Sequence, residues 1–441
     1  MTHVDLDPAA VRPVVEARLG RDPQDMLEAA VVLEAWAGMG GGRALLAGRR
    51  LMSTAPATAE RSVAKLPRPQ HEPRLLRDGA AFVIAVIAIA FWAAPLTSDL
   101  GVAVVRDALT VALSLTLALQ WALRSRFLDH RGGLLELARH RVALVLAPGA
   151  TVLAGAVALG HAGTLAALLT VTWVGGTILL RRNWPLPYVT IVLAATAAMA
   201  VGLPALDVVR GAGVLTTLAA VAALRPHELE PPPMPAAARR AERTACSAAI
   251  GAGVGLMLVL DPSVSWTAGA VPALALAPSA VAALWGAAEL CRLEPAILRG
   301  LAGVPVRGAR SRPRSRPALG VLLGAVGRLL ALTAALSALL LLTPWLGDSV
   351  RGAGVLAGFG LLALASLLVG LLDSLGGSRW VLAAVALGVG VEALVRIEGD
   401  VPFAGVGLVA GGATAAALAL PALVVVLRRS ARTVATTLWI R

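Results

Sequence analysis

Long apolar runs alternate with short polar segments along most of this chain. From residue 79 onward the pattern predicts twelve apolar helices, each near the roughly 20 residues that cross a bilayer. The predicted spans are 79–96, 102–123, 142–160, 163–180, 186–203, 207–225, 244–260, 266–290, 319–343, 350–372, 380–396 and 402–427. The pattern therefore predicts an all-α polytopic membrane protein with about 12 transmembrane helices.

The composition favours lipid as the solvent of this chain. Of its 441 residues, 58% are hydrophobic and 15% are charged, whereas a soluble domain is about 25% charged. A net charge of +13 would suggest nucleic acid as the partner of a soluble protein. In a membrane protein, arginine retained on the cytoplasmic side explains the same charge. We therefore expect the lipid bilayer as a partner and no nucleic acid. Lys65 is the single lysine, a bias typical of a GC-rich, actinobacterial genome.

Basic residues fall in every second gap between the apolar runs. With residues 1–78 on the cytoplasmic side, 34 of the 39 lysines and arginines lie on that side. The exceptions are Arg106, Arg210, Arg351 and Arg396 at the outer side, and Arg328 within a span. The positive-inside rule then predicts a multi-pass protein of the bacterial inner (plasma) membrane, with both termini cytoplasmic.

The polar segments divide the chain into five parts. Helical patterns within residues 22–36 and 43–52 predict a small helical cytoplasmic region, which is a candidate docking site for partner proteins. The parts are 1–78 (cytoplasmic helices and linker), 79–225 (first transmembrane half), 226–243 (cytoplasmic linker), 244–427 (second transmembrane half) and 428–441 (cytoplasmic tail). Two six-helix halves in parallel orientation are a common transporter plan.

A second self-similarity groups the helices differently. Residues 209–215 recur without change as residues 350–356, each copy following a proline and an aspartate. This repeat relates spans five and six to spans nine and ten, so the choice between a six-plus-six and a hairpin-based repeat stays open. Acids at these outer helix starts favour the positive end of the helix dipole, and arginines one turn in can pair with them. The candidate outer polar ring is Asp99, Arg106, Asp107, Asp207, Arg210, Asp348 and Arg351.

Ionisable residues at membrane depth are candidates for a cavity or for coupling to an ion. Four stand out: Arg328, Glu392, Arg396 and Glu289. Glu392 lies four residues before Arg396, a spacing that permits an ion pair on one helix face. Because a charge facing lipid is costly, we expect Arg328 and Glu392 to face protein.

Signatures of catalysis are absent from the sequence. It has no His-Glu-x-x-His, no Gly-x-Ser-x-Gly and no aspartate-rich diphosphate motif, and the two cysteines have no metal-ligand spacing. We therefore predict no catalytic, cofactor-binding or metal-binding residues, and the sequence favours a protein that is not an enzyme.

The six-plus-six plan resembles two transporter superfamilies, the major facilitator group and the flippases that export polysaccharide-lipid or drugs. In the loop after span two, only Asp129 and Gly132 agree with the major facilitator motif. A cytoplasmic N-terminal domain followed by about eleven Ala/Leu-rich spans also resembles the multispan membrane subunit of actinobacterial type VII secretion. That family carries a β-rich N-terminal domain, whereas residues 1–78 have a helical pattern.

These observations lead to one function and one alternative. We predict a multi-pass inner-membrane transporter or flippase-like exporter of an amphipathic or lipid-linked substrate. It would have a central cavity between two six-helix bundles, lined by Arg328 or Glu392. The alternative is a non-catalytic membrane scaffold or channel subunit of a multiprotein complex, such as a secretion or polymer-export system.

Overall fold

The structure, a computed structural model, describes most of the chain in two compact units. The units are residues 1–68 and 69–441, and each is described by itself. None of the described residues lies in a β-strand, so their fold is all-α. The described residues are 15–16, 22–23, 25–36, 41–53, 72–128, 137–224, 237–261, 271–290, 293, 316–342, 350–375, 377–398 and 404–428.

The N-terminal unit contains the two helices that the sequence predicts. They are α2 (Met26–Trp36) and α3 (Gly41–Ser53), and their buried faces meet around Leu33 and Leu51. The Asp25 side chain accepts the backbone N–H of Glu28 at 2.7 Å and so caps α2. In the sequence, Asp22 followed by Pro23 has the pattern of an N-cap before a first helical residue, but the residue that caps α2 is Asp25.

The second unit consists of long apolar helices. Eight of its described helices are long and apolar enough to cross a membrane, and three shorter apolar helices cover Pro185–Ala200, Thr244–Val259 and Ala275–Trp285. The helices are α4 (Glu72–Ala90), α5 (Ala93–Leu100), α6 (Val102–Leu123), a π-helical turn η1 (Arg124–Leu128), α8 (Arg141–Arg181), α9 (Pro185–Ala200), α10 (Ala205–Ala223), α11 (Ala237–Val259), α12 (Val271–Leu290), α14 (Arg316–Leu341), α15 (Val350–Ser374), α16 (Ser378–Glu398) and α17 (Val406–Arg428). These positions agree with the apolar runs of the sequence.

Helix α8 consists of two helices joined by a sharp turn. Gly160 has φ +58° and ψ −130°, which interrupts the helical backbone within the 41 residues of α8. The two arms turn back on each other, because a side chain at Gly155 or at Gly163 would contact the backbone of the other glycine. Only residues without a Cβ allow this approach. The break falls at residue 160, where the predicted third span ends.

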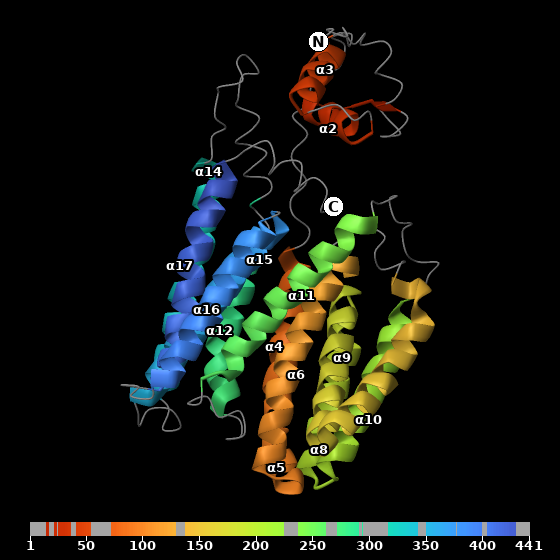
Figure 1. Ribbon diagram of the computed structural model, residues 1–441, viewed down its shortest axis with the longest axis vertical. Helices are drawn as coiled ribbons and strands as arrows, with labels where there is room; N and C mark the ends of the chain where they lie inside the picture. Colours follow the sequence, from red (N-terminus) through yellow and green to blue (C-terminus); the bar gives the residue numbers. More distant parts are fainter. Residues whose placement is uncertain are drawn as a thin grey trace. The chain divides into compact units, whose positions relative to one another are not determined.

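The helices of the second unit pack as two sets, which we call the N-terminal set (α4–α10) and the C-terminal set (α11–α17). Each set encloses its own cluster of buried apolar side chains. The packing partners correspond between the sets: α10 packs against α8 and α9, as α17 packs against α15 and α16. Likewise α4 packs against α9, as α11 packs against α16. Figure 1 shows α4, α6, α11 and α12 between the remaining helices of the two sets.

The two sets meet where α6 packs against α11 and where α4 packs against α12. At the first contact, a Cβ on Gly255 would lie 2.6 Å from the Cα of Ser114, and one on Gly251 would lie 3.0 Å from the Cα of Ala118. The spacing Gly-x-x-x-Gly on α11 therefore brings the two backbones together, as in other closely packed membrane helices. At the second contact, a Cβ on Gly79 would lie 2.9 Å from Leu284 Cδ1.

Candidate functional site

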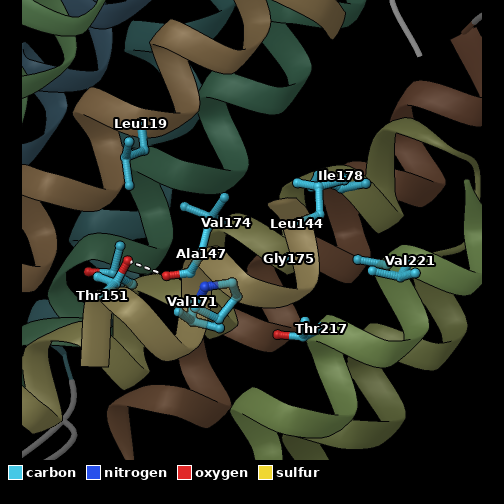
Figure 2. Close-up of a pocket in the computed structure, with 13 residues that line it drawn as sticks. Leu119, Leu144, Ala147, Thr151, Val171, Val174, Gly175, Ile178, Thr217 and Val221 are labelled. Atoms are coloured by element: carbon cyan, nitrogen blue, oxygen red, sulfur yellow. Dashed lines mark hydrogen bonds between the residues drawn. The ribbon is translucent and has the colours of Figure 1, made fainter. Parts of the chain in front are cut away.

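An apolar crevice opens within the N-terminal set. It has a cavity volume of about 130 Å³ and is bounded by α6, both arms of α8, and α10 (Figure 2). Leu119 of α6 and Ala147 of the first α8 arm line it and are themselves exposed, so the crevice reaches the surface of the helix bundle. The lining residues are Leu119, Leu144, Ala147, Pro148, Thr151, Thr170, Val171, Val174, Gly175, Ile178, Thr217, Ala220 and Val221.

Three threonines supply the only side-chain polar groups of this lining. Thr151 donates its hydroxyl to the Ala147 carbonyl at 2.7 Å, which Figure 2 marks, and Thr217 donates to the Gly213 carbonyl at 2.8 Å. Thr170 is buried, and its hydroxyl has no hydrogen-bond partner among the described residues. Because no lining residue carries a charge, the crevice suits a hydrocarbon chain better than a charged solute.

The first arm of α8 is the loosest wall of the crevice. Val142, Leu146, Leu153 and Val157 on this arm are all exposed. Pro148 lies inside the arm and cannot donate a backbone hydrogen bond to the carbonyl of Leu144. This arm has few packed side chains and a proline in its middle. Moving it therefore breaks fewer contacts than moving any other wall of the crevice.

Two carboxyl groups meet at the start of α17. Glu392 of α16 is only 1% exposed, and Asp261, just beyond α11, is 5% exposed. A Cβ atom added to Gly407 would lie 3.2 Å from Asp261 Oδ2 and 3.3 Å from Glu392 Cγ. Both acidic side chains therefore face the same point on α17. Asp261 Oδ2 accepts the backbone N–H of Leu408 at 3.1 Å, in the first turn of α17.

Glu392 has no comparable bond. Within the described residues, neither oxygen of its carboxyl group has a hydrogen-bond partner. The backbone N–H of Asp261 faces this carboxyl without reaching hydrogen-bonding geometry. A Cβ on Gly411 would lie 3.0 Å from Glu392 Oε2, so α17 presents a glycine surface to the acid. The expectation that Glu392 faces protein is confirmed.

The other residues expected near a cavity lie elsewhere. Arg396 is exposed and forms no ion pair with Glu392, because one side chain points outward and the other inward. Arg328 is also exposed, so the expectation that it faces protein is wrong. Leu322, Ala325 and Leu329 form the buried stripe of α14 and turn Arg328 away from it. The side chain of Glu289 lies outside the described residues.

The outer polar residues form separate local pairs. Arg210 donates to Asp207 at 2.6 Å, as the spacing predicts, and Arg106 contacts its neighbour Asp107 at 3.1 Å. Each of these side chains is more than half exposed, so the pairs contribute little to stability. Asp348 and the side chain of Arg351 lie outside the described residues.

One of these acids has a role that the sequence did not reveal. Asp99, at the end of α5, accepts the backbone N–H of Ala205 at the start of α10, at 2.7 Å. Asp261 makes the corresponding bond in the C-terminal set, from beyond α11 to the start of α17. Both acids therefore cap a helix start from a different helix. The ion pairs of Arg106 with Asp107 and of Arg210 with Asp207 each stay within one helix, so among the described residues they do not join the expected ring into one network.

The expected central cavity does not correspond to the crevice. The crevice lies within the N-terminal set, and neither Arg328 nor Glu392 lines it. At the junction of the sets, close backbone contact between α6 and α11 occupies the space instead. No protein-family model matches this chain, and no similar curated protein was found.

Proposed function

We propose that this chain is a transporter or flippase-like exporter that moves an amphipathic or lipid-linked substrate across the membrane. The observation that carries the proposal is the crevice between α6, α8 and α10, with its charge-free lining. It is open at Leu119 and Ala147, where a hydrocarbon chain dissolved in the bilayer reaches it directly. Thr170 supplies a buried hydroxyl that a polar group of the substrate can pair with.

The proposed architecture is twelve spans in two parallel halves of six. The eight long apolar helices, the second arm of α8 and the three shorter apolar helices together supply these spans. The corresponding contacts within the two sets support a repeat of six helices, as do the caps by Asp99 and Asp261. In the contacts α6–α11 and α4–α12, the second helix of each set packs against the first helix of the other set. A two-fold axis along the membrane normal would produce this pair of contacts. The proposed orientation keeps both termini cytoplasmic.

The experiment that tests this function is transbilayer movement of a labelled lipid. Purified protein is reconstituted into liposomes that contain a phospholipid with a fluorophore on its acyl chain, and a membrane-impermeant quencher reports the fraction in the outer leaflet. We expect protein-containing vesicles to equilibrate the label between leaflets faster than protein-free vesicles. Equal rates for this lipid and for an isoprenoid-linked analogue, both at the protein-free level, would contradict the proposal and favour the scaffold alternative.

A further inference from the structure

The carboxyl groups of Asp261 and Glu392 form a site that the crevice does not explain. Asp261 follows the end of α11 and Glu392 lies in the last two turns of α16, and both face the same point beside Gly407 at the start of α17. Glu392 is 99% buried in a span of apolar residues, yet its oxygens have no hydrogen-bond partner among the described residues. Burying a carboxylate that has no hydrogen-bond partner costs much free energy, so a carboxyl group in this position indicates a bound ligand or a functional role.

Few of the described side chains around Glu392 carry a charge that could neutralise it. Helices α11, α15 and α17 pack against α16, and around Glu392 they contribute Met257, glycine backbone and apolar side chains. Asp261 is the titratable group that faces Glu392 from α11, and α17 has none at this end. The cations at this end are Arg396, which is exposed on the same helix, and Arg351 at the start of α15, whose side chain is outside the described residues.

Within the part of the chain that the structure describes, the site has too few oxygen ligands for a metal ion. Ca²⁺ takes six to eight oxygen ligands, and Mg²⁺ requires an octahedral set. The described residues contain no group of three or more His, Cys, Asp or Glu side chains that could hold a metal. One oxygen of Asp261 is already engaged by Leu408. A proton needs a single carboxyl oxygen, and two acids that face each other in apolar surroundings cannot both be ionised without strong repulsion.

We propose that Asp261 and Glu392 form a proton-binding site that couples transport to protons, an inference that rests on the proposed function. While α16 and α17 are packed together, the pair holds one proton, which forms an O–H bond with a carboxylate oxygen and removes one negative charge. When the helices part and water enters, the proton passes to water and the carboxylate is solvated. Protonation therefore favours the packed arrangement, and the occupancy of the site is tied to the conformational cycle. In the proposed topology the pair lies near the outer face, so protons enter it from outside.

The first test measures the proton itself and does not require transport. Infrared difference spectra of the purified full-length protein, recorded during a pH titration, report the C=O stretch of protonated carboxyl groups. We expect a band that persists at neutral pH in the wild type, disappears in Glu392→Gln, and remains in Asp99→Asn. Asp99 is the matched control, because it makes the corresponding helix cap in the N-terminal set but is exposed. An unchanged band in Glu392→Gln, or its absence from the wild type, would overturn the proposal, because Glu392 would then hold no proton at neutral pH.

The second test measures coupling in proteoliposomes. An imposed pH gradient should change the initial rate of lipid movement by roughly tenfold in the wild type, and by the same factor in Asp99→Asn. Glu392→Gln, which has no carboxyl group to titrate at this position, should move lipid at the same rate with and without the gradient. A response that follows a sodium gradient at constant pH would replace the proton by Na⁺ and overturn the proposal. If no variant moves lipid at all, the proposed function fails while the infrared titration still decides whether the site binds a proton.

Discussion

Replacing Gly251 with valine is expected to destabilise the whole second unit. A Cβ at this position would contact the carbonyl oxygen of Leu117 and lie 2.7 Å from its carbonyl carbon. These atoms belong to the backbone of α6 and cannot turn aside as a flexible side chain can. Overpacking of this kind costs roughly 1–3 kcal/mol, and α6 would have to move away from α11. The expected result is a lower unfolding temperature in detergent, measured by the loss of the monodisperse peak in size-exclusion chromatography after heating.

Gly327→Val is the matched control for this prediction. Gly327 also lies inside a long apolar helix, α14, but a Cβ there would have no heavy atom within 4 Å. The cost of placing valine in a helix is the same at both positions, so only the contact between the helices differs. Equal unfolding temperatures for Gly251→Val and Gly327→Val would show that the contact between α6 and α11 contributes nothing to stability.

Filling the crevice with tryptophan is expected to stop transport while the protein remains folded. Ala147 lines the crevice from the first arm of α8 and is exposed, so its enlargement meets little resistance from the fold. An indole would take the place of roughly eight substrate atoms, and at ~0.3 kcal/mol per atom the affinity should fall about fiftyfold. The lipid-movement assay should therefore show Ala147→Trp near the rate of protein-free vesicles.

Ala150→Trp separates blocking of the crevice from a general effect of tryptophan. Ala150 is exposed on the same arm, three residues further along, and does not line the crevice. Its variant should move lipid at the wild-type rate, and both variants should elute and unfold like the wild type. Transport that survives in Ala147→Trp, or fails equally in both variants, would show that this crevice is not the substrate path.

The apolar runs predicted the positions of the helices well, because span length and hydropathy are local properties. The second predicted span, 102–123, has the bounds of α6. Residue 160, where the third predicted span ends, is Gly160, the break within α8. The N-cap of α2 was misplaced by three residues, because two aspartates precede this helix and the one that accepts the Glu28 N–H is Asp25.

The site was less accessible to sequence reasoning because it depends on contacts between distant segments. Glu392 was singled out by its depth, but its neighbour Asp261 was not, since nothing local relates it to a helix start 147 residues away. The sequence does contain one signal for such a cap, which is an acid at the end of an apolar run. Asp261 directly follows one apolar run, and Asp99 lies close after the end of another. The exposure of Arg328 was not predicted, because the expectation considered only the free-energy cost of a charge in lipid. It did not consider which face of α14 carries the buried apolar residues.

A transporter built from two repeated halves requires that the halves move relative to each other, because alternating access opens the substrate site to one side of the membrane at a time. A cross-link between the halves tests it most directly, in a background in which Cys246 and Cys291 are replaced by serine. Gly79→Cys with Leu284→Cys would join α4 to α12, where a Cβ on Gly79 would lie 3.0 Å from Leu284 Cγ. Gly253→Cys with Val385→Cys is the control within the C-terminal set, since their Cβ atoms would lie 3.8 Å apart, the usual separation in a disulfide.

Lipid movement is then measured in proteoliposomes before oxidation, after oxidation and after reduction. The proposed mechanism predicts that the Gly79→Cys, Leu284→Cys pair loses transport on oxidation and regains it on reduction, while the Gly253→Cys, Val385→Cys pair transports throughout. Undiminished transport with the two halves fully cross-linked would contradict the mechanism.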